Sequence, residues 1–206
     1  MVVVLSGIFL TGCAGMFSPK LNQSLTQQDF SPPILAQYIC EETNRARKKN
    51  NKKALPFRNV LFKGARLHSL RMKDLGFFEH ENPHEGHFRT PNDRVTASGG
   101  FGANVAENIA YLSILNTENK NANVFVIDSE QALFSLSQGG EPIPHHTYET
   151  FAQRVVQEWL DSPGHRVNLL HDDAVELGCG VSFEHKKNQI PMIYAGQLFQ
   201  MRRALE

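Results

Sequence analysis

Apolar positions recur at helical spacing in two segments of the first half of the chain. The first segment follows Ser-Pro-Pro at residues 31–33, which is typical of a helix cap and first turn, and it continues to about Lys49. The second segment starts at Asn59, a candidate cap, and ends at Gly76. Its apolar face is formed by Leu61, Ala65, His68, Met72 and Leu75. The spacing predicts two amphipathic helices, and His68 is expected to be a hydrogen-bonded core residue outside any site.

A third helix is predicted after Thr147, which is a candidate cap. Its apolar face has no gap and is formed by Tyr148, Phe151, Ala152, Val155, Val156, Trp159 and Leu160. Ser-Pro-Gly at residues 162–164 should end this helix, because the residue before a proline is pushed out of the helical region.

Two strands are predicted near the end of the chain. Apolar residues alternate with small ones from Leu177 to Phe183, and a second apolar run extends from Ile190 to Phe199 after a polar turn. These runs should pair as an antiparallel hairpin. Another short strand is predicted at the apolar residues 124–127. Helices that precede and surround strands near the end of the chain indicate an α+β fold with a small, mainly antiparallel sheet.

The stretch from about 111 to 147 contains an asparagine-rich run, two adjacent glycines and two prolines. Such a composition is typical of loops. We interpret this stretch as an insertion that contributes little to the core.

The amino-terminal residues predict an export signal. The apolar run Val2–Leu10 is too short to cross a membrane, and it leads through Thr-Gly to Cys13. A short apolar run followed by small residues and a cysteine is typical of a bacterial lipoprotein processing site. We expect a signal peptide over residues 1–12, lipids on Cys13 and a polar tether over residues 13–30. A plain secretory peptide or a buried amino-terminal strand would also account for the apolar run.

Composition narrows the function classes. The chain has 206 residues, of which 41% are hydrophobic and 20% are charged, and this is enough for a packed core. Lysine plus arginine equal aspartate plus glutamate at 21 each, so no nucleic-acid partner is predicted. Three cysteines are too few for a disulfide scaffold. Cys40 and Cys179 either pair outside the cytoplasm or remain two buried thiols.

Three segments carry residues suited to chemistry. They are Phe-Phe-Glu-His-Glu-Asn-Pro at 77–83, Ala-Glu-Asn-Ile-Ala at 106–110, and Trp-Leu-Asp-Ser-Pro-Gly-His-Arg-Val-Asn at 159–168. The chain has no nucleophile elbow, P-loop or C-x-x-C motif. Each segment places an ionisable residue at the edge of an element, where side chains from distant segments can converge.

Together and in this order, these segments resemble the signatures of the CAP superfamily, also called the SCP or cysteine-rich secretory protein domain, in a bacterial lipoprotein form. Further matches are Asn44-x-x-Arg47, Ala65-x-x-His68-Ser69, Arg94, Gly178-x-Gly180 and Tyr194-x-x-Gln197-x-Phe199. The resemblance implies a three-layer α-β-α sandwich over residues 31–201, interrupted by the insertion at about 111–147.

The resemblance also implies a cleft lined by two histidines and two acids. Matched motif by motif, the histidines are His80 and His165, and one acid is Glu107. Members with the full set carry a glutamate three positions after the helix tryptophan, where this chain has Ser162. The set is therefore one acid short of the family pattern.

Two imidazoles and one carboxylate have several possible uses. They can form a Zn²⁺ shell with one open position, a proton-sharing cluster, or a polar network that stabilises the cleft. We assign no catalytic residue and expect a membrane-anchored, extracytoplasmic binding module for a metal, a small ligand, or an envelope or host protein. The alternative is a zinc-dependent hydrolase in which Glu107 is the general base and His80 and His165 hold the metal.

The other candidate residues receive structural interpretations. His84, His87, His145 and His146 are expected in solvated loops, with extra metal ligation as the alternative. Arg94, Arg166 and Asn168 are expected to fix loop geometry.

Overall fold

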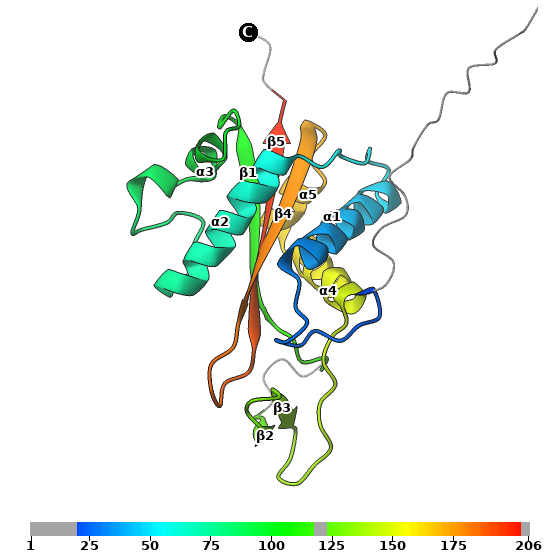
Figure 1. Ribbon diagram of the computed structural model, residues 1–206. Helices are drawn as coiled ribbons and strands as arrows, with labels where there is room; N and C mark the ends of the chain where they lie inside the picture. Colours follow the sequence, from blue (N-terminus) through cyan, green and yellow to red (C-terminus); the bar gives the residue numbers. More distant parts are fainter. Residues whose placement is uncertain (1–19, 118–122, 203–206) are drawn as a thin grey trace, which may run out of the picture.

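A three-stranded antiparallel sheet lies at the centre of the molecule (Figure 1). The computed structural model describes residues 20–117 and 123–202. The strand order is β1-β5-β4, with β1 at Val105–Ser113, β4 at Ala174–Glu184 and β5 at Met192–Met201. The predicted hairpin of the last two strands is confirmed, since β4 pairs with β5 along its length.

Helices cover both faces of this sheet (Figure 1). On one face lie α1 (Pro32–Lys49), α4 (Tyr148–Asp161) and α5 (Pro163–Leu169). On the other face lie α2 (Asn59–Leu75) and α3 (Pro91–Ala97). The expected three-layer α-β-α arrangement is therefore confirmed.

The alternation in β4 explains how the layers pack. Leu177, Cys179 and Val181 are buried in the core shared with α1 and α4. Gly178 and Gly180 face α2 instead, and a Cβ atom added to Gly180 would lie only 2.1 Å from the backbone nitrogen of Arg66. The small residues in this strand thus let α2 lie directly on the sheet.

The predicted helix ends agree closely with the structure. The first helix begins after Ser31, and Gly76 ends α2 in the left-handed conformation with φ of 72°. Thr147 caps α4 through a reciprocal pair of hydrogen bonds with Thr150. Asn59 is the first residue of α2, whereas we predicted it as the cap, a position that Arg58 occupies.

A disulfide joins Cys40 of α1 to Cys179 of β4, with their Cα atoms 5.9 Å apart. The two cysteines are separated by 139 positions in the chain. Of the two readings of these cysteines, the paired one is confirmed. The bond fixes the first helix to the edge strand of the sheet.

The segment before α1 packs against the domain, although we expected a tether over residues 13–30. Leu25 is fully buried, and its backbone nitrogen donates to the carbonyl of His146 at 2.8 Å. Residues before Lys20, including Cys13 and the expected signal peptide, lie outside the described residues.

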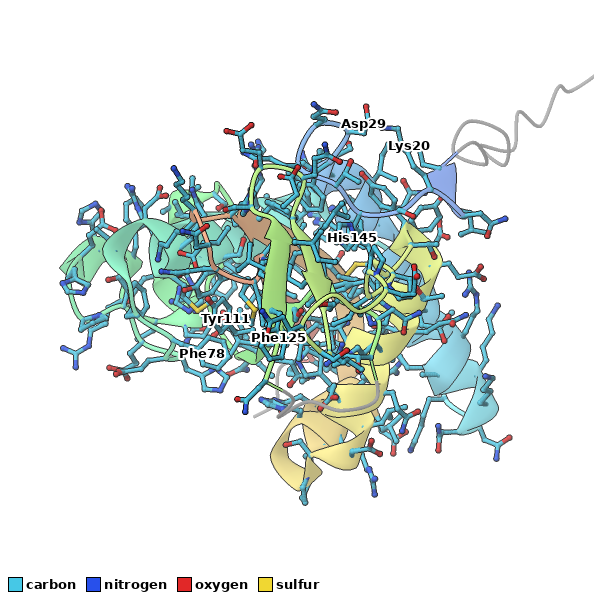
Figure 2. All side chains as sticks on the ribbon, turned by 90° about the horizontal axis from the view of Figure 1, so that it is seen from below. Lys20, Asp29, Phe78, Tyr111, Phe125 and His145 are labelled. Atoms are coloured by element: carbon cyan, nitrogen blue, oxygen red, sulfur yellow. A yellow bond between two sulfur atoms is a disulfide. The ribbon has the colours of Figure 1, made fainter. Side chains whose placement is uncertain are left out.

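The insertion has a small core of its own, separate from the main core of the domain. It contains the short strands β2 (Phe125–Asp128) and β3 (Leu133–Ser135), and the first agrees with the strand predicted at 124–127. Buried side chains hold it together, namely Leu115, Ala132, Phe134 and Ile143. Seen from below, Phe125 and His145 lie in front of the sheet (Figure 2).

Within the described residues, no helix is long and apolar enough to span a membrane.

Candidate functional site

Glu107 lies at the centre of the candidate site, buried at the edge of the sheet. It is on β1, and its side chain is 2% exposed. Its Oε1 accepts a 2.6 Å hydrogen bond from Nη2 of Arg94, which is equally buried on α3. A buried carboxylate requires such a charged partner, because an isolated charge in the interior is strongly destabilising.

Arg94 also fixes the loop that carries His80, as the sequence predicted. Its guanidinium donates to the backbone carbonyls of Phe88 and Arg89, and Nη2 donates to the carbonyl of His80 at 3.1 Å. One side chain thereby connects α3, the loop before it and Glu107.

His80 is the exposed member of the cluster. Its Nδ1 donates to Oε2 of Glu107 at 3.0 Å, and its side chain is 51% exposed. Because the carboxylate can only accept, this bond places the proton of the neutral ring on Nδ1. The Nε2 atom is then free to accept a hydrogen bond or to bind a metal.

His165 approaches His80 from a short helix that we did not predict. Pro163 ends α4 as expected but also starts α5, where a proline is favoured in the first turn. The ring centroids of His165 and His80 are 6.2 Å apart. The structure therefore brings together all three predicted site residues.

Two asparagines hold α5 against β1. Nδ2 of Asn168 donates to the carbonyl of Glu107 at 3.1 Å and to Oδ1 of Asn108 at 3.0 Å. Nδ2 of Asn108 donates to the carbonyl of His165 at 3.1 Å. The expectation that Asn168 fixes local geometry is confirmed, and its partner Asn108 positions the backbone of His165.

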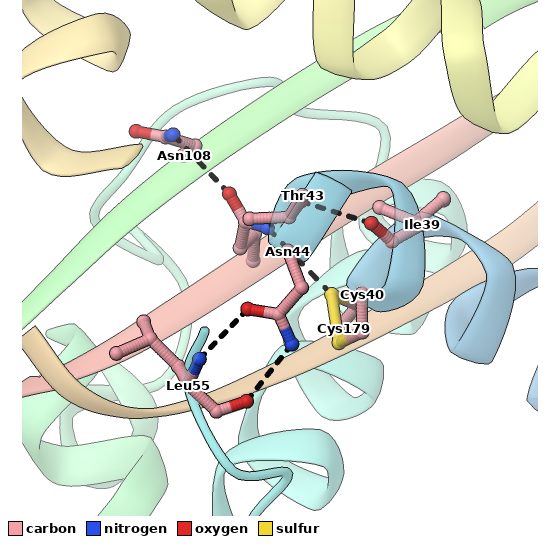
Figure 3. The surroundings of a disulfide bond; sticks show 8 residues. Ile39, Cys40, Thr43, Asn44, Leu55, Asn108 and Cys179 are labelled. Atoms are coloured by element: carbon pink, nitrogen blue, oxygen red, sulfur yellow. Dashed lines mark hydrogen bonds between the residues drawn. A yellow bond between two sulfur atoms is a disulfide. The ribbon is translucent and has the colours of Figure 1, made fainter. Parts of the chain in front are cut away.

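The same network reaches the disulfide through the core. Nδ2 of Asn108 also faces Oε1 of Gln197 at 3.4 Å, and Nε2 of Gln197 donates to Thr43 and to the sulfur of Cys179 (Figure 3). These side chains are buried, so each polar group in the chain of contacts needs its partner. The disulfide and the candidate site thus share one polar network.

His68 belongs to the surroundings of the site, although we predicted it outside any site. It is a hydrogen-bonded core histidine as expected, with Nε2 donating to the carbonyl of Glu79 at 2.9 Å. The same atom lies 3.8 Å from Oε2 of Glu107. No sequence signal indicated this contact, because β1, which carries Glu107, was not among the predicted strands.

Burial lowers the pKa of both His68 and His165. Desolvation is the larger cause in each, and for His165 the neighbouring His80 lowers the pKa further. For His68 the charge of Glu107 opposes the effect of burial. Both rings are therefore held in the neutral form to a lower pH than an ordinary histidine.

An aromatic group extends from the site along β1. Phe78 lies two residues before His80 and packs against Tyr111, with ring centroids 6.0 Å apart (Figure 2). Tyr111 in turn packs on Tyr194 at 4.3 Å and donates to Oε2 of Glu184 at 2.8 Å. Phe78 is 47% exposed, so it adds an exposed aromatic ring to the pair of tyrosines.

The geometry tests the predicted zinc shell of His80, Glu107 and His165. Both carboxylate oxygens of Glu107 already accept hydrogen bonds, one from Arg94 and one from His80. Glu107 is therefore placed to orient His80, as a carboxylate often does behind a metal-binding histidine, rather than to coordinate an ion itself. Among the described residues, no group of three or more His, Cys, Asp or Glu side chains is arranged to hold a metal.

The remaining histidines are divided between loop and core. His84 and His87 lie in the segment around Pro83 and the short 3-10 helix Gly86–Phe88. The prediction of a solvated loop is wrong for His146, which is 5% exposed. Its Nδ1 donates to Thr150, and its Nε2 accepts from Arg154 at 3.1 Å. Burial lowers its pKa to about 4.

Comparisons with known proteins agree with this architecture. The sequence profile of the cysteine-rich secretory protein (CAP) family matches residues 40–199. The protein YkwD of Bacillus subtilis is 28% identical over 166 residues, which are 79% of this chain and 49% of that protein. The chain thus spans about half the length of this curated relative.

Two solved structures show the same fold. An extracellular protein containing an SCP domain from Bacillus anthracis has a TM-score of 0.54 and 23% identity, covering 83% of this chain and 41% of that one. An outer surface protein of Borrelia burgdorferi has a TM-score of 0.50 and 16% identity, covering 87% of this chain and 99% of that one.

Proposed function

Since the chain belongs to the cysteine-rich secretory protein (CAP) family, we propose that it is an extracytoplasmic binding module held at the bacterial envelope by lipids on Cys13. Its ligand contacts the imidazoles of His80 and His165. The module is not an enzyme, and its ligand is a metal ion, a small polar molecule, or a side chain of an envelope or host protein.

One observation carries this proposal. The half-exposed ring of His80 is fixed through Nδ1 by a buried carboxylate, and a second imidazole lies beside it at 6.2 Å. A ring fixed in this way presents Nε2 in one orientation, which lowers the entropic cost of binding.

The arrangement favours binding over zinc-dependent hydrolysis. A general base needs an oxygen that can take a proton from water, within hydrogen-bond reach. Glu107 is buried with both oxygens engaged, by Arg94 and His80. Its geometry suits an orienting partner for His80, and no second acid takes the position of Ser162.

Zinc is the first probe, because imidazole nitrogens are common zinc ligands. Titration calorimetry should show one weak site in the wild-type chain and its loss in the variant His80→Ala/His165→Ala. The matched control is His84→Ala/His87→Ala, which removes two loop histidines from outside the pair and should keep the site. Unchanged uptake in the first variant would overturn the assignment of these residues, and no uptake by the wild type would remove zinc as the ligand.

The envelope location is supported from two directions. The Cys40–Cys179 disulfide fits an oxidising compartment, and the two structural relatives are described as extracellular and outer surface proteins. In detergent phase separation, the wild-type chain should enter the detergent phase and Cys13→Ser should enter the aqueous phase. Retention of the variant in the detergent phase would contradict the lipid anchor.

A further inference from the structure

A hollow of about 440 Å³ lies between α1, the loop before α2, α2 itself and β4. We call it the α1–α2 hollow. Its apolar walls are formed by Pro33, Leu55, Phe57, Phe62 and Leu177, and its polar lining by Gln37, Glu41, Asn44 and Asn59, with Cys40 of the disulfide completing it. Its volume is within the range of sites that bind small molecules.

This hollow is separate from the histidine cluster. The cluster is built around β1, whereas Leu177 and Cys40 place the hollow over β4. These two strands are the opposite edges of the sheet, with β5 between them. A ligand here would therefore occupy a second site.

The loop that forms one wall is fixed at both ends. Asn44 of α1 holds the backbone of Leu55 by two hydrogen bonds, from Nδ2 to the carbonyl at 2.9 Å and from the backbone nitrogen to Oδ1 at 2.8 Å (Figure 3). Farther along, the loop pairs with Leu177 of β4. The backbone nitrogen of Arg58 donates to the carbonyl of Leu177, and the backbone nitrogen of Leu177 donates to the carbonyl of Pro56. The loop cannot close into the hollow without breaking these bonds.

The disulfide fixes the opposite wall. It ties α1 to β4 at Cys40, directly beside the lining residues Gln37 and Glu41. The walls are therefore held apart by covalent and backbone bonds, and the hollow is preformed rather than opened by a ligand.

The ring of Phe57 remains half in solvent although it lies over an apolar hollow. Phe57 is 53% exposed. The centroids of the Phe57 and Phe62 rings are 5.9 Å apart, and the two ring planes are inclined at 45°. Backbone pairing of Phe57 with Leu177 keeps the ring in this position. Two adjacent aromatic rings in a preformed hollow suit a flat apolar group, which stacks or packs edge-on against them.

The charged residue in the lining indicates which polar group a ligand with such an apolar part would carry. Among the described residues that line the hollow, Glu41 is the only charged one. It is exposed and accepts a hydrogen bond from Nε2 of Gln37 at 2.8 Å. A carboxylate at the rim favours a cationic or hydrogen-bond-donating group and disfavours an anion.

We propose that the α1–α2 hollow is a second binding site, for a small amphiphile with a flat apolar body and an amine head. The body packs between Phe57, Phe62 and Leu177, and the amine reaches Glu41. The site does not depend on the ligand of the histidine cluster.

Two probes with the same fluorescent naphthalene test this site on the full chain. Dansylcadaverine ends in a primary amine, and dansylglycine ends in a carboxylate. The fluorescence of dansylcadaverine should increase and saturate with one site, and dansylglycine should bind more weakly. Phe57→Ala should weaken both probes by about tenfold, because it removes most of the aromatic contact.

Substitutions that remove a negative charge distinguish the contribution of the head group to binding from that of the apolar body. Glu41→Gln should lower the affinity for dansylcadaverine by about two- to fivefold, as expected for the loss of an exposed ion pair. The variant should therefore discriminate less between dansylcadaverine and dansylglycine. Glu42→Gln, at the next position of α1 and outside the lining, is the matched control and should change neither probe. Far-ultraviolet circular dichroism verifies that each variant is folded.

Two results would overturn the proposal. One is the absence of saturable binding of dansylcadaverine to the folded wild-type chain. The other is binding that stays unchanged in both Phe57→Ala and Glu41→Gln. If Phe57→Ala does not fold, Asn59→Trp, which adds bulk to the lining from an exposed position, should weaken both probes, and unchanged binding would count against the site.

Discussion

The buried pair of Glu107 and Arg94 is the residue-scale feature on which the candidate site rests. The pair joins β1 to α3, and Arg94 also holds the loop of His80. Neither side chain is more than 2% exposed. Removing one partner leaves the other charge buried without compensation.

Glu107→Gln should therefore lower the free energy of unfolding by about 3–5 kcal/mol, as measured for other broken buried pairs. The double variant Arg94→Met/Glu107→Leu should lose less, because it leaves no unpaired charge. Urea unfolding of the wild type and both variants measures these changes. A Glu107→Gln variant as stable as the wild type would show that the pair is not buried as described.

His146 predicts a dependence of stability on pH. Burial lowers its pKa in the folded chain to about 4, below the ordinary value of about 6.5 in the unfolded chain. Between these values the unfolded chain binds a proton that the folded chain does not, so stability falls as pH falls through this range. The loss reaches about 3 kcal/mol near pH 4.

The variant His146→Gln isolates this contribution, because glutamine does not titrate. At pH 7 the wild type should be the more stable protein by urea unfolding, since His146 bonds Thr150 and Arg154. Its advantage should shrink steadily from pH 6.5 to pH 4. An advantage that stays constant over this range would contradict the burial of the ring.

At the scale of elements, the sequence predicted those whose apolar positions have a clear period. The helices α1, α2 and α4 and the hairpin of β4 and β5 follow from such patterns. The short helices α3 and α5 were missed because seven residues contain too few turns for a period to show. The consequence was local, since His165 was placed at a helix end instead of on α5.

The disulfide is the covalent tie between elements, and its loss should affect both stability and the site. The variant Cys40→Ser/Cys179→Ser should lose about 2–5 kcal/mol of unfolding free energy, because a long loop in the unfolded chain is no longer closed. Reduction of the wild type should produce a similar loss. Urea midpoints that do not change in either case would exclude a stabilising bond.

At the scale of the whole molecule, the sequence indicated which residues form the site but not how each is used. His80, Glu107 and His165 do converge, as their motifs implied. The role of Glu107 depends on Arg94 and His68, which reach it from other elements, and no spacing along the chain reveals such contacts. The packing of residues 20–30 was missed for the same reason, because their few apolar residues pack on the main core, where Phe30 contacts Tyr148 of α4 and Phe183 of β4.

The whole molecule presents two candidate sites at the two edges of one sheet. The polar network through Asn108, Gln197 and Cys179 joins the histidine cluster to the disulfide beside the α1–α2 hollow. In each site a loop is held in place by hydrogen bonds from a neighbouring helix, as a preformed binding site requires.

The claim that His80 and His165 lie side by side is tested most directly by the pKa of His165. Imidazole signals in nuclear magnetic resonance spectra, followed over pH, give this value in the wild type, in His80→Gln and in the control His84→Gln. We predict a lowered pKa for His165 in the wild type, a rise toward the ordinary value in His80→Gln, and no change in His84→Gln. An ordinary pKa for His165 that does not respond to His80→Gln would show that the two rings are not neighbours.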